Sequence, residues 1–367
     1  MTDKTNLVLL FGGRSGEHAV SLMSARSVLG AIDTHKYNVY QVGITQEGEW
    51  LTGENVLKVF EDGQLGSLKP ALLSNEYGNI VLNERHDNKL HKVGYVDVVF
   101  PLLHGTFGED GTMQGLLEIL DVAYVGAGVL GSAIAMDKGV AKHLIEAEGI
   151  PVLEYQIFTR LQIREHMDSV IHQAEQVAPY PLFVKPCNLG SSVGISKVLD
   201  RAGLVAALLK AAKYDRRILV ERGLDKAREI EVSVLGNDET IASLPGEIIP
   251  DDIFYTYDDK YFNGEAELCI PAALTGTQTN TIQKLANEAY KALDGAGMAR
   301  VDFLIDRKTE AIYFNEINTI PGFTNISMYP KLWKVCGLDY PDLIDRLIQL
   351  GLERKQDRDA TVRKFED

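Results

Sequence analysis

The sequence has few cysteines and no long apolar segment. Its three cysteines show no CxxC spacing, which excludes a disulfide scaffold and favours a reducing compartment. No apolar run is long enough to cross a bilayer. The first residues, MTDKTNLVLLFGG, lack the basic start and the small-residue cleavage site of a signal peptide. We therefore expect a cytoplasmic protein without a membrane partner.

Positive charge is also scarce. The 367 residues include 37 basic and 52 acidic side chains, which gives a formal net charge of −15. So acidic a protein is a poor general binder of nucleic acid, and we expect no nucleic-acid partner. A composition of 45 % hydrophobic and 24 % charged residues is ordinary for a globular protein. The length predicts two or three domains.

Two familiar phosphate-binding patterns are missing: the GxxxxGK[ST] order of a P-loop and the GxGxxG fingerprint. In their place, residues 188–196 read NLGSSVGIS, directly after the strand-like run LFVKP. Glycines leave backbone N–H groups open to phosphate oxygens, and the serines add hydroxyl donors. Such loops are also common without a ligand, so this one supports a phosphate site only together with other groups.

The sequence does contain a regular alternation of strand and helix patterns. Continuous apolar runs such as NLVLLF are typical of buried parallel strands. The alternation predicts an α/β domain up to about residue 125. It consists of strands at 6–11, 37–44, 95–103 and 122–125, and helices at 22–32 and 113–120.

The remainder mixes both element types, which makes the fold class α/β (α+β). A polar, tyrosine-rich loop lies at 252–267. We predict helices at 132–148, 164–178, 201–213, 278–293 and after 330, and strands at 180–186, 217–222, 229–236, 240–249, 299–306 and 311–318.

The last two strands carry a cluster of oxygen-bearing side chains. Residues two apart in a strand point to the same face, so Arg300 and Asp302 share one face, as do Glu316 and Asn318. A turn at 307–310 would bring Asp302 close to Glu316. Two adjacent carboxylates favour a cation between them, and Mg²⁺ accepts such oxygens. The alternative is a solvated polar face on which Arg300 simply neutralises Asp302.

Other groups could hold a nucleotide across from this hairpin. Lys185 ends the strand before the glycine–serine loop, and Lys138 begins a helix. Either could be an ordinary solvated lysine. The strand at 218–222 could offer its backbone to a purine, and Glu229 could accept ribose hydroxyls. Together these groups predict a cleft between two domains, with lysines on one wall and carboxylates on the other.

This arrangement resembles the bacterial D-alanine–D-alanine ligases, members of the ATP-grasp superfamily. The resemblance covers nearly the whole chain in the family's order. It rests on GGRSGEHAVS (12–21), HGTFGEDGTMQG (104–115), MDK (136–138), VKPCNLGSSVGISKV (184–198), RVDF (300–303) and NEINTIPGFT (315–324).

The resemblance implies an ATP-grasp fold of three domains, with the active site between the central and C-terminal domains. An N-terminal domain (1–127) would bind the first D-alanine. A central domain (128–222) would carry the phosphate loop, and a C-terminal domain (223–367) the metal site and a lid loop. The segment at about 45–95 is similar to that of the longer family members.

The resemblance also implies the cofactors, ATP and two Mg²⁺ ions, with Mn²⁺ as a substitute. Asp302, Glu316 and Asn318 match the metal ligands. The family often has lysine where this chain has Arg222. The ATP site would comprise Lys138 and Lys185 for the phosphates, Glu221, Arg222 and Leu224 for adenine, Glu229 for the ribose, and Ser192 and Lys260.

For the substrates, the resemblance implies a second set of residues. Glu17 would hold the ammonium of the first D-alanine, with Ser191 and Tyr261 as its hydrogen-bonded partners. His104 matches a histidine near that substrate's carboxylate. Arg300 and the Gly322 amide match the oxyanion site, and Ser327 the group that binds the second carboxylate.

The activity implied by the resemblance is ATP-dependent ligation of two D-alanines through a D-alanyl phosphate, for peptidoglycan precursors, by a homodimer. One alternative is another ATP-grasp ligase such as a D-alanine–D-lactate ligase. It would keep the ATP motifs but change Glu17, Ser191 or Tyr261, and members that make D-alanine–D-lactate usually lack this tyrosine. A second alternative, a nucleotide-binding regulatory protein, would lose metal or oxyanion residues, and this chain keeps them.

Overall fold

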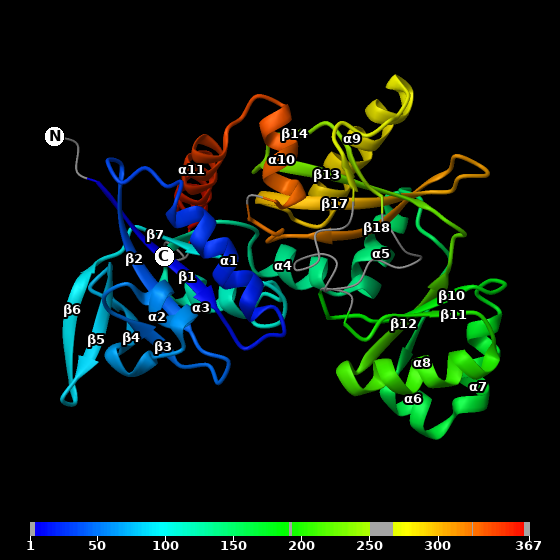
Figure 1. The fold of residues 1–367 in the computed structure, drawn as a ribbon, viewed down its shortest axis with the longest axis horizontal. Coiled ribbons are helices and arrows are strands. Elements are labelled where there is room, and N and C mark those ends of the chain that lie inside the picture. Colours follow the sequence, from blue (N-terminus) through cyan, green and yellow to red (C-terminus); the bar gives the residue numbers. More distant parts are fainter. Residues whose placement is uncertain (1–3, 191–192, 250–266, 325, 363–367) are drawn as a thin grey trace.

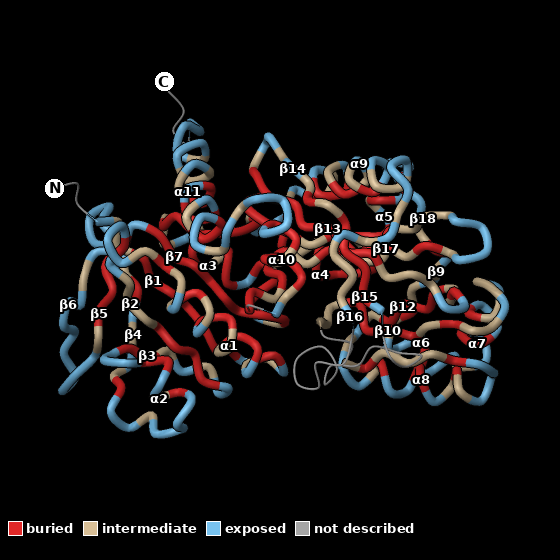
Figure 2. The backbone as a smooth tube through the Cα atoms, turned by 45° about the horizontal axis from the view of Figure 1, so that its top comes forward, coloured by how far each residue is buried: buried red, intermediate tan, exposed pale blue. Residues whose placement is uncertain are grey.

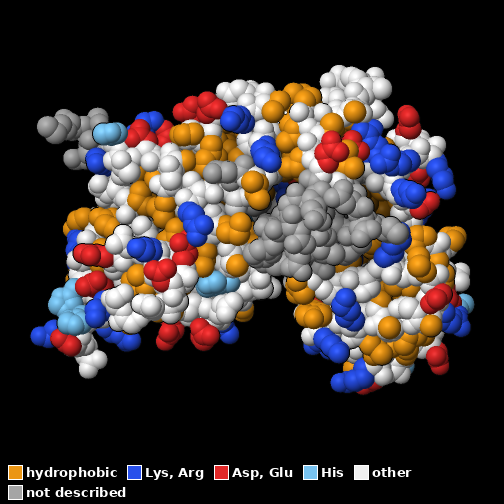
Figure 3. Space-filling view, viewed as in Figure 1, with side chains coloured by type: hydrophobic (Ala, Val, Ile, Leu, Met, Phe, Trp, Pro, Cys, Tyr) orange, Lys and Arg blue, Asp and Glu red, His pale blue; other side chains and the backbone are white. Residues whose placement is uncertain are grey.

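The computed structural model describes residues 4–190, 193–249, 267–324 and 326–362. These residues form three β-sheets with helices packed against them (Figure 1). No helix in these ranges is long and apolar enough to span a membrane. Acidic and basic side chains are intermixed on the face drawn in Figure 3.

The N-terminal sheet has the strand order β6-β5-β4-β3-β2-β1-β7-β8. Its centre is parallel, because β1 pairs in parallel with both β2 and β7. This confirms the alternation predicted from the sequence. The elements are β1 (Thr5–Gly12), α1 (His18–Leu29), β2 (Tyr37–Ile44), β7 (Val98–Pro101), α3 (Thr112–Leu120) and β8 (Ala123–Tyr124).

The segment at 45–95 extends this sheet on one side with antiparallel strands. Its outermost strand, β6, is almost wholly exposed, whereas β1 is buried (Figure 2). The segment comprises β3 (Trp50–Thr52), α2 (Val56–Asp62), the 3₁₀ helix η1 (Leu65–Ser67), β4 (Lys69–Glu76), β5 (Asn79–His86) and β6 (Lys89–Tyr95).

The central part corrects one prediction. The helix expected at 132–148 is two helices, α4 (Val129–Met136) and α5 (Lys138–Ala147). Asp137 separates them, because its backbone is extended and its Oδ1 accepts the N–H groups of Gly139 and Val140 at 3.0 and 2.9 Å. Such an N-cap starts a new helix, so Lys138 becomes the first residue of α5.

The central sheet has the order β11-β10-β12-β9. The helix predicted at 164–178 is also divided, into α6 and α7. The elements are β9 (Tyr155–Thr159), α6 (Arg160–Glu165), α7 (Met167–Glu175), β10 (Leu182–Pro186), β11 (Ser196–Val198), α8 (Arg201–Tyr214) and β12 (Arg217–Arg222).

The C-terminal sheet has the order β16-β15-β13-β17-β18, with β14 beside β13. The single run predicted at 240–249 forms two strands, because Pro245 lies between them and proline cannot donate to a sheet ladder. The elements are β13 (Arg228–Gly236), β14 (Thr240–Ala242), β15 (Gly246–Ile249), β16 (Glu267–Cys269), α9 (Gly276–Ala292), β17 (Gly297–Ile305), β18 (Ile312–Asn318), α10 (Met328–Val335) and α11 (Tyr340–Asp359).

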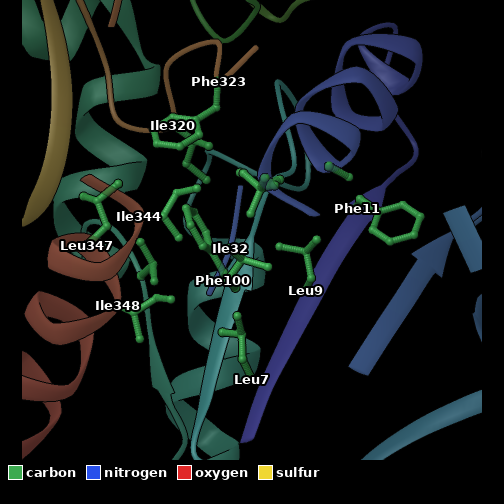
Figure 4. Packing of buried hydrophobic residues seen from close by; sticks show 14 of the residues in the cluster. Leu7, Leu9, Phe11, Ile32, Phe100, Ile320, Phe323, Ile344, Leu347 and Ile348 are labelled. Carbon is green, nitrogen blue, oxygen red and sulfur yellow. The ribbon is translucent and has the colours of Figure 1, made fainter. Parts of the chain in front are cut away.

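One hydrophobic core joins the two ends of the chain. Leu7 and Leu9 of β1 pack in the same cluster as Ile344 and Leu347 of α11 (Figure 4). Phe323, from the loop after β18, lies in this cluster with its ring 5.9 Å from that of Phe100 in β7. Burial of these apolar side chains fixes the loop after β18 against the N-terminal sheet.

Candidate active site

The β17–β18 hairpin brings the predicted carboxylates together. Asp302 lies opposite Glu316 and Arg300 opposite Asn318, with an irregularity just after Asp302. The turn between the strands spans 306–311. The predicted proximity of Asp302 and Glu316 is therefore confirmed.

Arg300 is tied to acidic groups on its own strand and on the neighbouring β13. Its Nε and Nη2 each donate to the Asp302 carboxylate at 2.7 Å, and its Nε lies 3.1 Å from Glu231 Oε2. The Asn318 amide donates to Asp302 Oδ2 at 3.2 Å. The planar guanidinium suits this bidentate contact, so Arg300 does neutralise Asp302, as the alternative interpretation of the hairpin held.

Lys138 contacts the same hairpin from α5, a helix that packs in one core with β18. Its Nζ lies 3.1 Å from Glu316 Oε2 and donates to the Leu189 carbonyl at 2.8 Å. Burial favours the neutral amine, but the attraction of Glu316 outweighs burial and raises the pKa of Lys138. The start of α5 is fixed by a hydrogen bond from the Lys138 N–H to the Cys187 carbonyl at 3.0 Å. Lys138 therefore carries its positive charge at the cleft.

Lys185, at the end of β10, contacts the Glu221 carboxylate on the neighbouring strand. Its Nζ also lies 3.4 Å from Asn315 Oδ1 of β18. Lys142 of α5, which the sequence reasoning missed, has its Nζ 3.0 Å from Glu221 Oε2. Burial alone would raise the pKa of Glu221, but the two lysines lower it to about 2. The sequence signal for Lys142 was its position four residues after Lys138, which places both side chains on one face of a helix.

The segment expected to bind adenine connects the central and C-terminal sheets. Arg222 ends β12, and its backbone N–H donates to the Glu154 carbonyl at 2.9 Å. Leu224 is buried in the link to β13. Glu229 lies on β13 opposite Leu304 and Ile248 and is partly exposed.

Glu17 lies just before α1 and faces two glycines. A Cβ built on Gly105 would stand 2.4 Å from Glu17 Oε2, and one on Gly190 would stand 2.6 Å from it. Side chains at these two positions would displace the carboxylate. Glu17 therefore lies between the N-terminal sheet and the start of the glycine–serine loop.

His104 is buried with both ring nitrogens engaged. Nδ1 lies 3.0 Å from the Ile320 carbonyl, and Nε2 lies 2.9 Å from Ser24 Oγ. The carbonyl contact assigns the ring proton to Nδ1. Burial lowers the pKa of His104 to about 4, so the ring is neutral. His104 holds the loop after β18 in place.

Glu109 is a second residue that the sequence analysis did not identify. It contacts the backbone N–H of Ile320, the loop residue whose carbonyl contacts His104. Its carboxylate accepts the N–H groups of Gly105 at 2.7 Å and Ile320 at 3.1 Å. Burial, with the nearby Glu17, raises its pKa to about 8. The signal was its position inside HGTFGEDGTMQG, but no local pattern reveals a contact with residue 320.

Gly322 and Ser327 lie next to each other after β18. A Cβ on Gly322 would come 3.0 Å from Ser327 Oγ. That oxygen accepts the Thr324 N–H at 3.1 Å, and Ser327 is the N-cap of α10. Helix N-termini attract anions, so this corner suits a carboxylate.

Part of this set lines one small cavity of about 90 Å³, whose lining does not include Lys138, Lys185, Asp302 or the residues expected to bind adenine and ribose. Ser191, Ser192, Lys260 and Tyr261 lie outside the described residues. The lining combines Glu17, His104 and Glu109 from the N-terminal part, Gly190, and Arg300, Glu316, Asn318, Gly322 and Ser327 from the C-terminal part.

The hairpin offers hard oxygen donors for a divalent cation. No group of three or more His, Cys, Asp or Glu in the described part of the chain has metal-binding geometry. The set Asp302, Glu316 and Asn318 instead combines two carboxylates with an amide. Its carboxylates face one another and are each matched by a cation, Arg300 or Lys138. The chemistry of this donor set fits Mg²⁺ or Mn²⁺.

Comparison with known proteins identifies the family. The family model "D-ala D-ala ligase N-terminus" matches residues 6–127, and "D-ala D-ala ligase C-terminus" matches residues 144–349. The D-alanine–D-alanine ligase of Thermoanaerobacter sp. is 49 % identical over 360 residues, 97 % of this chain and 99 % of the relative. The chain belongs to the D-alanine–D-alanine ligase family.

Other relatives and solved structures agree with this assignment. The D-alanine–D-alanine ligase of Chloroherpeton thalassium is 48 % identical, covering 97 % of this chain and 98 % of that protein. The structure of the D-alanine–D-alanine ligase from Coxiella burnetii matches with a TM-score of 0.83 and 35 % identity, over 98 % of this chain and 97 % of that one.

The structure of the VanG D-Ala:D-Ser ligase from Enterococcus faecalis also has a TM-score of 0.83 and 35 % identity, over 95 % of this chain and 100 % of that one. The chain therefore has the ATP-grasp fold, as predicted. The family is ATP-dependent and uses a divalent metal.

Proposed function

We propose that this ligase joins two D-alanine molecules to D-alanyl-D-alanine, with ATP converted to ADP and phosphate, for peptidoglycan precursors. Family membership supports the reaction. The observation that carries it is the hairpin pair of Asp302 and Glu316, with the Lys138 amine 3.1 Å from the Glu316 carboxylate. A phosphoryl-transfer site needs such opposed charges.

The first step activates a carboxylate. An oxygen of the first D-alanine's carboxylate attacks the γ-phosphorus of ATP, the bond to ADP breaks, and an acyl phosphate forms. Lys138 and Lys185 bind the phosphates, and Glu221, Arg222, Leu224 and Glu229 line the nucleoside site. Asp302, Glu316 and Asn318 would hold two Mg²⁺ ions, or Mn²⁺ in their place. When bound, these ions neutralise phosphate charge.

The second step forms the peptide bond. The neutral amine of the second D-alanine attacks the acyl carbonyl carbon, and as the tetrahedral adduct collapses the phosphate leaves with the proton that the amine loses. Arg300 and the Gly322 N–H stabilise the oxyanion, a contribution of about 3 kcal/mol per donor. Glu17 holds the first ammonium with Ser191 and Tyr261, and His104 lies near the first carboxylate. Ser327 binds the second carboxylate, and Ser192 and Lys260 complete the nucleotide site.

Phosphate release from ATP tests the substrate assignment. D-Alanine, L-alanine, D-lactate and D-serine would be supplied separately and in pairs with D-alanine, at neutral and raised pH, with products identified by mass. We expect release only with D-alanine present, and D-alanyl-D-alanine as the main product. Release without D-alanine, or a main product containing lactate or serine, would overturn the assignment. Glu316→Ala should abolish turnover.

Two further expectations belong to this proposal. The chain is divided into domains at about residues 127 and 222, as the three sheets suggest. It acts as a homodimer, which light scattering would test. The exposed apolar side chains Leu72, Leu90, Val93 and Tyr95 on β4 and β6 offer surface that a second copy could cover.

A further inference from the structure

A fully buried lysine stands behind the proposed phosphate lysines. Lys142 is 1 % exposed, and so is Glu221, whose carboxylate lies between Lys142 and Lys185. Lys138 and Lys142 are one helical turn apart on α5. Glu221 is thus shared by two amines that come from different elements, one from α5 and one from β10.

The cluster carries more positive charge than its own stability requires. Within the described part of the chain, the three amines of Lys138, Lys142 and Lys185 pair with two carboxylates, those of Glu221 and Glu316. One lysine would be enough to neutralise Glu221, and a second buried cation is costly. Burial accordingly lowers the pKa of Lys142. An excess cation kept at this expense indicates that an anion enters the cluster.

The two contacts of Glu221 are not equivalent. Lys185 is 8 % exposed, and its Nζ also lies near Asn315 of the opposing hairpin, so its amine borders the cleft. Lys142 lies deeper, and among the described residues Glu221 is its carboxylate partner. Only Lys185 can therefore turn toward a ligand, and only Lys142 can stay behind to neutralise Glu221.

We propose that Lys142 is a positioning residue for the nucleotide, which keeps Glu221 neutralised so that the Lys185 amine is free to bind ATP phosphate. The inference rests on the proposed function. Without Lys142, moving Lys185 to phosphate would leave a buried, unpaired carboxylate, which is strongly unfavourable. Lys185 would then stay on Glu221 and nucleotide affinity would fall.

Calorimetric titration with MgADP tests this directly. We expect Lys142→Met to weaken MgADP binding about tenfold or more, which corresponds to 1.4 kcal/mol or more. Steady-state kinetics should show a matching rise in the KM for ATP and no comparable rise in the KM for D-alanine. The exposed Lys58→Met on α2 is the matched control and should bind like the wild type. MgADP affinity of Lys142→Met within twofold of the wild type would overturn the proposal.

Two variants that lack the Glu221 charge distinguish the proposed positioning role of Lys142 from a purely structural one. In a Glu221→Gln background no carboxylate retains Lys185, so adding Lys142→Met should change MgADP affinity less than twofold. A tenfold loss between these two variants would overturn the proposal. This comparison remains decisive even if Lys142→Met alone fails to fold.

Failure of the proposed function would look different. A wild-type protein that binds no MgADP, or that hydrolyses ATP without D-alanine, contradicts the ligase assignment. A wild type that binds MgADP normally, with Lys142→Met binding equally well, contradicts only the role of Lys142.

Discussion

Lys138 Nζ lies 3.1 Å from Glu316 Oε2, so a lysine expected to bind phosphate contacts a carboxylate expected to bind metal. Arg300, expected at the oxyanion site, likewise donates two hydrogen bonds of 2.7 Å to the expected metal ligand Asp302 on its own strand. Cationic and anionic groups of the site thus neutralise one another. Ligands must replace these contacts when they bind.

Metal affinity should rise when Lys138 is removed. Lys138 competes with a cation for Glu316, so Lys138→Met should bind Mn²⁺ about tenfold more tightly than the wild type in the absence of nucleotide. Calorimetry or the paramagnetic signal of free Mn²⁺ measures this. The control Lys58→Met should bind Mn²⁺ as the wild type does. Equal or weaker binding by Lys138→Met would contradict the competition.

Activity should depend on Glu109 although it lies outside the expected catalytic set. At about pH 9, above the Glu109 pKa of about 8, the ionised carboxylate accepts the Gly105 and Ile320 N–H groups, and Glu109→Gln puts an amide donor in its place. The loop that carries Gly322 should then shift, and kcat should fall on the order of 10²-fold. Glu239→Gln, in an exposed turn, provides the control. If kcat stays within twofold, the Glu109 contact does not position the loop.

Stability should rise with pH between about 4 and 6.5 because of His104. The folded pKa is about 4 and the unfolded one about 6.5, so in this interval the unfolded chain binds more protons. The contribution of His104 to the free energy of unfolding is complete above pH 6.5. It is lost as the pH falls toward 4, and the total loss is about 3 kcal/mol.

Denaturant unfolding at several pH values checks this expectation. The free energy of unfolding should change less steeply with pH in His104→Gln. It should change as in the wild type in the exposed control His172→Asn. The His104 ring signal in NMR should show no titration above about pH 5. A midpoint near 6.5 would show that the ring is not buried in solution.

Salt should weaken the contact between α11 and the N-terminal sheet. Arg358 pairs with Glu118 and with Asp121 at 3.1 Å, and Lys355 lies 3.3 Å from Asp121. Arg358→Met should lower the free energy of unfolding by about 1 kcal/mol at low salt. The difference should shrink at about 1 M salt, where the Debye length is about 3 Å. A loss that does not depend on salt would indicate packing instead.

Sequence patterns predicted elements well where periodicity carried the information. The strand expected at 37–44 is β2 with the same bounds, and side-chain alternation brought Asp302 beside Glu316. The helix expected at 132–148 was wrong, because apolar spacing continues through Asp137 while its side chain caps a new helix. Local apolar spacing does not show whether Asp137 continues one helix or caps a new one.

Contacts between distant residues were the other limit. Glu109 bonds a backbone group 211 positions away, and Lys142 of α5 contacts Glu221 of β12, which lies far along the chain. Both acquire their role from the packing of the sheets. The proposed roles of the remaining site residues came from recognising motifs, and their chemistry awaits the experiments above.

Helix α5 connects the two walls by ion pairs one turn apart. Lys138 binds Glu316 in the C-terminal sheet, and Lys142 binds Glu221 in the central sheet. Any swing that separates these sheets must break one pair or carry α5 along with one wall. Because α5 packs in one core with the C-terminal sheet, a swing of the central sheet would break the Lys142–Glu221 pair, and a one-residue insertion between the lysines would turn Lys142 by about 100° away from its partner.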